Sequence, residues 1–169
     1  MSCNRFLVIG YGNPLRGDDG VGQSVAERVA SWQLAGVRSL AVHQLTPELV
    51  MELAEAETVI FVDAWIGAFD LETAAIRLEI LQRTTPDDPA GHAMDPRTLL
   101  VLTELLENHQ PQAYQLLIPA QQFEFSEEFS ALTQRGMEQA LATLKQLFAL
   151  DQIDFFLQSN QCIDQGRLL

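Results

Sequence analysis

The chain has 169 residues, 47% of them hydrophobic, and its 23 acidic side chains against 10 basic ones give a formal net charge of -13. This length suits one domain with a substantial core and leaves no room for a second independent domain. Nucleic-acid binding depends on Lys and Arg side chains that neutralise phosphates, so the charge argues against nucleic acid and against an anionic membrane surface as partners.

The N-terminal segment has the pattern of a buried strand and not of a targeting sequence. Its apolar run, Phe6 to Ile9, is too short for a signal h-region or a membrane span. The two cysteines, Cys3 and Cys162, lie near opposite ends of the chain and form no disulfide framework or zinc motif. We therefore expect a cytoplasmic protein.

Short apolar runs alternate with segments of helical period, which is typical of an α/β fold with a mainly parallel sheet. The expected strands, in chain order, cover residues 6–9, 37–42, 58–63, 75–81 and 114–118. The expected helices cover residues 20–32, a segment that opens at Thr46, residues 95–107, and a closing helix from Ser126 to about residue 150. The pattern predicts a three-layer α/β/α sandwich over residues 1–150 and a partly disordered tail over residues 151–169.

Two details of this pattern concern element ends. Apolar and charged residues alternate along 75–81, and the link from Asp63 is scarcely long enough for a crossover helix, so this strand is expected to be antiparallel and near an edge. Thr46 is expected to cap its helix with its hydroxyl, and Asp95 to cap the next one. The buried side of that second helix is expected to carry Leu99, Leu102 and Leu106.

The loop after the first strand reads GYGNPLRGDDGVG over residues 10–22. A dinucleotide fingerprint needs a third glycine where Leu15 stands, and a P-loop needs Lys and then Ser or Thr where Asp18 and Asp19 stand. Two carboxylates beside a helix N-terminus suit a cation better than a phosphate. We expect one of the two to cap the helix, although capping alone does not require adjacent acids in so glycine-rich a turn.

Asp63 is the second candidate position, at the end of a strand that should be fully buried. In parallel sheets the functional crevice lies beyond the carboxyl ends of the strands, so Asp63 and Asp19 flank one crevice if strands 6–9 and 58–63 are neighbours. The structural alternative for Asp63 is a cap for Ala64 and Trp65, or a pair with a nearby base.

The third candidate is His92, which precedes a helix that should start at the same end of the sheet. Histidine with carboxylates suits a borderline divalent metal such as nickel or zinc. His43 is a weaker candidate at the rim. His109 is expected to be a surface side chain near the end of a helix.

Three motifs in these positions resemble a known family. The signature Gly-x-Gly-Asn-x-Leu-x-x-Asp-Asp/Glu-x-x-Gly is met at Gly10, Gly12, Asn13, Leu15, Asp18, Asp19 and Gly22. A strand ending in aspartate matches at Asp63, and a His-x-x-x-Pro element matches at His92 and Pro96. From about Phe6 to Leu150 the chain resembles the hydrogenase maturation endopeptidases, which trim the C-terminus of nickel–iron hydrogenase large subunits after nickel insertion.

The resemblance implies an endopeptidase that removes the C-terminal extension of a nickel-loaded large-subunit precursor. It implies that Asp19, Asp63 and His92 contact the metal, and that Asp19 or Asp63 activates a water. The nickel is expected to be carried by the substrate and not held by the resting enzyme. Metal-dependent and aspartic-type hydrolysis both remain open. The supporting loop residues are Gly10, Gly12, Asn13, Asp18, Gly20 and Gly22.

The segment Gln44-Leu45-Thr46-Pro47-Glu48 differs from the Asp-Gly-Gly-Thr pattern of many members and resembles the branch that serves bidirectional, NAD-linked hydrogenases. The expected protein is a monomer whose partner is the large-subunit precursor. The alternative is a non-enzymatic nickel-binding or chaperone module that uses the same three side chains. A nucleotide-binding enzyme is disfavoured by Leu15, Asp18 and Asp19.

Overall fold

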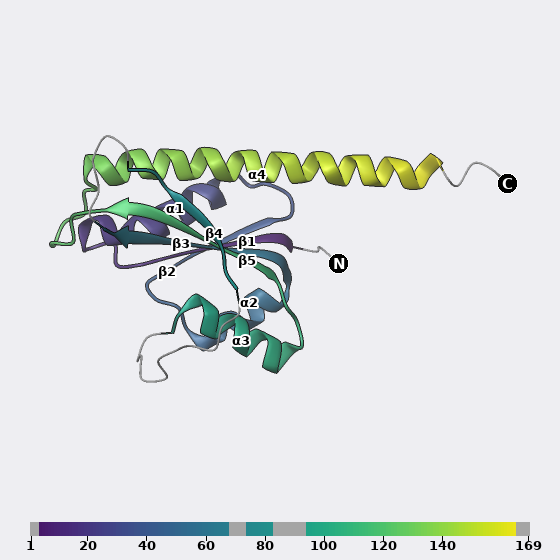
Figure 1. The fold of residues 1–169 in the computed structure, drawn as a ribbon, viewed down its shortest axis with the longest axis horizontal. Helices are drawn as coiled ribbons and strands as arrows, with labels where there is room; N and C mark the ends of the chain where they lie inside the picture. The colour runs from purple at the N-terminus through teal and green to yellow at the C-terminus, as the bar shows by residue number, and fades with distance from the viewer. Residues whose placement is uncertain (1–3, 68–73, 83–93, 165–169) are drawn as a thin grey trace.

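A five-stranded sheet lies between two layers of helices in the computed structural model, which describes residues 4–67, 74–82 and 94–164, with side chains for 5–67, 74–82 and 94–150 (Figure 1). The strands are β1 (Asn4–Tyr11), β2 (Val37–Val42), β3 (Ala56–Ile66), β4 (Arg77–Ile80) and β5 (Gln112–Ala120). The helical segments are η1 (Gly17–Gly20), α1 (Val21–Ser31), η2 (Pro47–Leu49), α2 (Val50–Ala54), α3 (Pro96–Glu107) and α4 (Ala131–Asp164).

The strand order is β2-β1-β3-β5-β4, with every pair parallel except β4 and β5. The predicted α/β/α class and mainly parallel sheet are confirmed, and the antiparallel strand lies at an edge as expected. Its hydrogen-bonded partner is β5, which lies between it and β3. The Arg77 guanidinium on β4 lies over the Trp65 ring of β3, 3.6 Å from its centroid, so the two strands also touch across β5.

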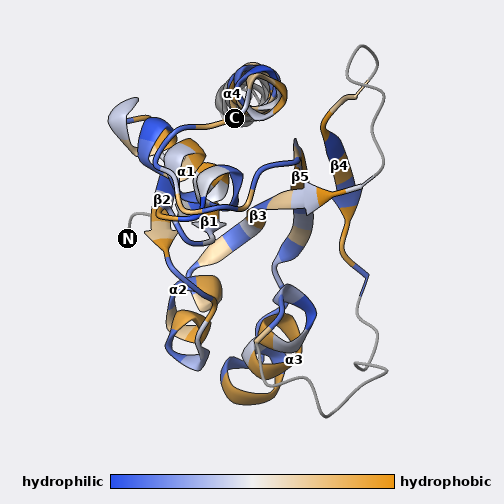
Figure 2. Ribbon diagram, turned by 90° about the vertical axis from the view of Figure 1, so that its left-hand side faces the viewer, coloured by the Kyte–Doolittle hydropathy of each residue, from blue (hydrophilic) through white to orange (hydrophobic). Residues whose placement is uncertain are grey.

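The core has two halves, one on each face of the sheet, because successive side chains of a strand point to opposite faces. β3 sends Val59 and Phe61 toward α2 and α3, and it sends Ile60 and Val62 toward α1 and α4 (Figure 2). Both faces are covered, which explains why this strand is an unbroken apolar run. Burial of a side chain such as Phe61 stabilises the fold by about 2 kcal/mol.

The closing helix begins at Ala131, so the predicted start at Ser126 is wrong. The backbone of Ser126 bonds to the glycine loop instead: its carbonyl accepts from the Gly17 N–H at 2.7 Å, and its N–H donates to the Leu15 carbonyl at 3.1 Å. Ser130 is the residue whose hydroxyl caps α4, accepting from the Thr133 N–H at 3.3 Å. Tertiary hydrogen bonds therefore override a local sequence that reads as a helix start.

Helix α3 is capped as predicted, since the Asp95 carboxylate accepts from the Thr98 N–H at 2.7 Å. Its buried side carries Leu99, Leu100 and Thr103, while Leu106 is exposed, which corrects the expected apolar face. Leu106 shares the side of Leu99 in helical period but lies in the last turn. That whole turn, residues 105–107, is exposed, so the helix extends past the core.

Two further expectations about element ends are wrong. The Thr46 hydroxyl makes no backbone cap; it bonds to the Glu48 side chain, and the segment opens as the short turn η2. His109 is not simply a surface side chain, because its Nε2 lies 2.7 Å from the carbonyl oxygen of Ala56, half-buried beneath the start of β3.

The backbone of α4 continues as helix past Leu150 to Asp164 and extends beyond the end of the sheet (Figure 1). The division into a domain over residues 1–150 and a tail over 151–169 stays a prediction, and residues 165–169 lie outside the described chain. In the parts of the chain that the structure describes, no helix has both the length and the apolar character needed to cross a membrane.

Candidate active site

The candidate site lies where the carboxyl ends of β1, β3 and β5 meet, at the left in Figure 1. Adjacent strands β1 and β3 pair Gly10 with Val62, so Tyr11 and Asp63 follow side by side. Asp63 does not end the strand as expected, because β3 continues to Ile66. The neighbouring positions of β1 and β3 are what brings the glycine loop and Asp63 to one crevice.

The Asp63 carboxylate is mostly enclosed and is bonded within the site. It accepts a hydrogen bond from the Tyr11 hydroxyl, which also bonds to the Gln115 side chain of β5. It accepts from the Ala64 N–H at 2.8 Å as well, so the structural cap considered for Asp63 is present alongside any chemical role.

Burial raises the pKa of the Asp63 carboxyl to about 6. The hydrogen bonds from Tyr11 and Ala64 oppose this rise, and the negative charge of Asp19 adds to it. The pKa of the Tyr11 hydroxyl is also raised, first by burial and then by the charge of Asp63. A carboxyl that titrates near pH 6 can take up or release a proton under physiological conditions.

Asp19 faces the same crevice from the glycine loop. Its Oδ2 accepts from the Asn13 N–H at 2.9 Å, and its negative charge helps to raise the pKa of Asp63. Neither Asp19 nor Asp18 caps α1, which contradicts the expected helix cap: the N-cap position is Gly20 and has no side-chain bond. The turn η1 precedes α1. From this turn the Asp19 carboxylate bonds back to the glycine loop, whereas the Asp18 carboxylate bonds to the segment between β5 and α4.

Asp18 is fully buried and accepts four hydrogen bonds from the segment between β5 and α4. Its Oδ2 accepts from the backbone N–H groups of Gln121 and Gln122, each at 2.9 Å, and from the Ser130 hydroxyl at 2.8 Å. Its Oδ1 accepts from the Ser130 N–H at 2.7 Å. Burial alone would raise the pKa of Asp18, but these bonds outweigh it and hold the pKa below its usual value. Asp18 is therefore an anchor that joins two loops.

Gly12 and Gly22 are among the glycines of the loop that have no room for a side chain. Gly12 has a φ of +133°, and a Cβ there would lie 1.9 Å from the carbonyl oxygen of Asp19. A Cβ on Gly22 would lie 2.4 Å from the carbonyl oxygen of Val62 and 2.5 Å from that of Tyr11. The first turn of α1 can thus approach β1 and β3 because residue 22 is glycine, and residue 10 must be glycine too, since a Cβ there would lie 1.8 Å from the Gly22 carbonyl oxygen.

His92 lies outside the described residues. Helix α3, which follows it, starts at the same end of the sheet as the candidate site. The negative charge of Asp95, at the cap of α3, contributes to the raised pKa of Tyr11. His43 is exposed just after β2, and its carbonyl accepts from the Gly12 N–H at 3.3 Å, so it lies at the rim as expected. Within the described residues, no three His, Cys, Asp or Glu side chains are grouped to hold a metal.

Sequence reasoning missed several residues that shape the site, namely Tyr11, Gln115, Gln23 and Ser130. Gln23 donates from Nε2 to the Gly12 carbonyl at 2.6 Å and so holds the loop from α1. Tyr11 occupies a variable position of the signature, and its only sequence signal is an aromatic residue at the end of a buried strand. Gln115 and Ser130 carry no signal, because they meet the site through strand pairing and a distant loop.

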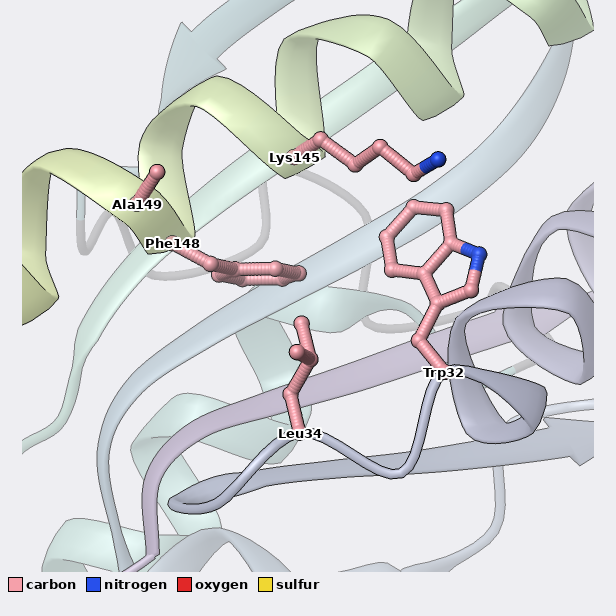
Figure 3. Close-up of a pocket in the computed structure, with 5 residues that line it drawn as sticks. All are labelled: Trp32, Leu34, Lys145, Phe148 and Ala149. Atoms are coloured by element: carbon pink, nitrogen blue, oxygen red, sulfur yellow. The ribbon is translucent and has the colours of Figure 1, made fainter.

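An apolar hollow of about 320 Å³ lies at the other end of the sheet, between the end of α1 and α4 (Figure 3). It is lined by Trp32, Leu34, Phe148 and Ala149, with the Lys145 ammonium 4.9 Å from the centre of the Trp32 ring. Leu34 precedes β2, whose first residue pairs near the start of β1, so this hollow lies far from Asp63.

The fold closely matches those of solved proteases. The nickel–iron hydrogenase maturation protease HycI from Thermococcus kodakarensis KOD1 aligns with a TM-score of 0.66 and 21% identity, over 83% of this chain and 90% of that one. The hydrogenase maturating endopeptidase HybD from E. coli aligns with a TM-score of 0.66 and 19% identity, over 88% and 93%. The chain shares the hydrogenase maturation protease fold.

A third protein with this fold is the hydrogenase 2 maturation peptidase of a Thaumarchaeota archaeon, with a TM-score of 0.64 and 22% identity over 86% of this chain and 99% of that one. No family model and no curated protein sequence matches the chain. The likeness is thus one of architecture, and it extends over 83% to 88% of this chain.

Proposed function

We propose that the chain is an endopeptidase that removes the C-terminal extension of a nickel-loaded hydrogenase large-subunit precursor. The observation that carries the proposal is the pair of Asp19 and Asp63 at the carboxyl ends of β1 and β3 in a hydrogenase maturation protease fold. One member of this pair, Asp63, has its pKa raised to about 6 by burial, which suits proton transfer near neutral pH.

Asp63 is the better candidate for the general base. In the proposed step its carboxylate takes a proton from a water molecule as the water oxygen bonds to the scissile carbonyl carbon. The proton then passes to the leaving amine nitrogen as the C–N bond breaks. Tyr11 holds the Asp63 carboxylate in place by its hydrogen bond, and the charge of Asp19 keeps Asp63 basic.

The nickel enters this scheme as part of the substrate. Two neighbouring carboxylates, one of them largely buried, are unfavourable when both are ionised, so a cation between them is stabilised. Together with His92 they form a donor set suited to nickel. Nickel bound in the precursor would thus be recognised by Asp19, Asp63 and His92 and would orient the extension next to Asp63.

The remaining parts of the proposal rest on the sequence. The segment Gln44-Leu45-Thr46-Pro47-Glu48 favours the branch that serves bidirectional, NAD-linked hydrogenases. The charge of -13 disfavours nucleic acid and an anionic membrane surface as partners, and the resemblance to the endopeptidase family favours a cytoplasmic monomer.

The test is to incubate the purified protein with nickel-loaded and with nickel-free precursor and to record the intact mass of the large subunit. We expect loss of a short C-terminal peptide from the loaded precursor alone. Asp19→Asn, Asp63→Asn and His92→Ala should each lower the cleavage rate about 10³-fold while the fold is retained. His43→Ala is the matched control, because this exposed histidine lies at the same end of the sheet and should cleave normally.

The non-enzymatic alternative gives a different result in the same experiment. A nickel-binding or chaperone module would bind the loaded precursor and leave its mass unchanged. Normal cleavage by His92→Ala would show that the three-residue site is wrong.

A further inference from the structure

We infer that three exposed apolar side chains beside the site, Leu15, Ile66 and Phe125, form a docking surface for an apolar and basic segment of the precursor. We call these three residues the apolar rim. The inference rests on the proposed function, since it names the part of the enzyme that binds the precursor outside the reacting atoms.

The apolar rim is formed by three segments that are far apart in the sequence. Leu15, Ile66 and Phe125 are 44%, 68% and 84% exposed. Single exposed apolar residues are common, but a group of them marks an interaction surface. The group arises because the N–H of Ser126 bonds to the Leu15 carbonyl, and because Ile66 pairs with Ala120 at the end of β5.

The segment that carries Phe125 is held on both sides. Before it, the N–H groups of Gln121 and Gln122 bond to Asp18, and after it Ser130 bonds to the same carboxylate. The exposed ring is therefore presented by a fixed backbone. A group fixed in advance loses little conformational entropy on binding, so its apolar area contributes more to affinity.

The charges around Phe125 indicate the chemistry of its partner. Glu124, Glu127 and Glu128 are all exposed on the same short segment. A partner that covers the ring must bring its own charges close to these three carboxylates. Lys or Arg residues next to apolar ones satisfy both conditions, whereas an acidic segment would be repelled.

The apolar rim lies within reach of the reaction. Ile66 follows Asp63 by three residues on β3, about 10 Å along the strand at roughly 3.3 Å per residue. Because successive side chains alternate, Ile66 lies on the face of the sheet that α1 and α4 cover, whereas Asp63 lies on the face that α2 and α3 cover. An extended segment of a few residues that passes over the carboxyl ends of the strands spans this distance. A precursor docked on the rim can therefore deliver its C-terminal extension to Asp63.

The test is steady-state cleavage of nickel-loaded precursor by Phe125→Ser and by Ile66→Ser. We expect KM to rise about tenfold in each variant with kcat unchanged, because the lost contact is made equally in the ground state and the transition state. Leu106→Ser is the matched control: it removes an equally exposed leucine at the far end of α3 and should keep the wild-type KM. Thermal unfolding of each variant verifies that the fold is retained.

A second variant tests the charge of the partner. The triple change E124Q/E127Q/E128Q should raise KM and make KM less sensitive to added NaCl. A wild-type KM for Phe125→Ser would overturn the inference, and so would a wild-type dimer that Phe125→Ser converts to monomer, since the rim would then pair two copies of this chain.

Failure of the proposed function is distinguishable from failure of the rim. If the wild type does not cleave, calorimetric titration of the loaded precursor into wild type and into Phe125→Ser still measures how much the apolar rim contributes to the affinity for the precursor. About tenfold weaker binding by the variant supports the docking surface without any cleavage. Equal binding by the two proteins contradicts it.

Discussion

Burial of the Asp63 carboxyl lowers the stability of the fold at neutral pH, and the same burial raises its pKa into the range where it can transfer a proton. Its pKa is raised to about 6 in the fold, against an ordinary value of 3.8. Because the folded state favours the protonated form, the stabilisation from this group is complete below about pH 4 and is lost as the pH rises through about 6. Above that pH the fold contains a buried charge beside Asp19.

At the residue scale this predicts opposite effects of Asp63→Asn on stability and on activity. The gain in the free energy of unfolding over wild type should grow between pH 4 and pH 7 to about 3 kcal/mol, while cleavage is lost. Urea unfolding at several pH values measures the gain. Glu138→Gln, an exposed acid of α4, is the control and should show no such trend. A gain for Asp63→Asn that does not vary with pH would contradict the assignment.

The placing of Asp19 and Asp63 at one crevice was predictable to the extent that each stands in a local pattern. Asp19 belongs to the glycine loop, and Asp63 follows an unbroken apolar run, although β3 continues beyond it to Ile66. Tyr11 and Ser130 were not predictable, because their contacts with the aspartates depend on strand register and on a segment 112 residues away from Asp18.

At the scale of elements, one buried carboxylate joins the glycine loop to the segment that leads into α4. Asp18 does this with four hydrogen bonds, three of them from backbone N–H groups. The Ser126 backbone adds two more bonds to the same loop. The position of Asp19 thus depends on residues far along the chain.

Asp18→Asn should lower the free energy of unfolding by on the order of 3 kcal/mol, because an amide nitrogen would face N–H donors that the carboxylate accepted. The loss is expected at neutral pH and should shrink in acid, since the lowered pKa of Asp18 means that its stabilisation is present above about pH 4 and lost below it. Glu128→Gln, exposed on the same segment, serves as control. Equal stability of Asp18→Asn and wild type at pH 7 would mean that the two loops are not held by this residue.

Elements were predictable where a local pattern and the core agree. The unbroken apolar run of β3 and the Asp95-Pro96 start of α3 are such cases. The start of α4 was not predictable, because Ser126-Glu127-Glu128 has the local composition of a helix N-terminus while its backbone pairs with Leu15 and Gly17. The exposed Leu106 differs from prediction because helical period does not say where the core ends.

At the scale of the whole molecule, the strand order determines which loops meet at the candidate site. The alternation of strands and helices predicted a parallel sheet, and the order β2-β1-β3-β5-β4 makes β1 and β3 neighbours. At 21% and 19% identity to two solved maturation proteases, the chain keeps their overall fold with a TM-score of 0.66 in each case. The fold class was therefore accessible from sequence, whereas the exact contacts between loops at the end of the sheet were not.

The net charge of -13 leads to a prediction for the whole molecule. Like charges repel one another most in the compact state, and salt screens them, so the melting temperature should rise by about a few degrees between roughly 0.02 M and 0.3 M NaCl. Differential scanning calorimetry measures the change. The ion pairs of Arg38 with Glu52 and Glu55 oppose it, but they are few against the excess of acids. A melting temperature that falls with salt would mean that ion pairs outweigh repulsion.

Ser130 both caps α4 and donates two hydrogen bonds to Asp18. The two residues are 112 positions apart, so during synthesis the ribosome releases the glycine loop first and its anchor much later. At 5–20 residues per second this delay is on the order of 10 s. During this delay Asp18 lacks the residues that donate hydrogen bonds to it, and the loop that carries Asp19 is not yet held in place. The candidate site therefore assembles late, when the segment before the closing helix has emerged and docked.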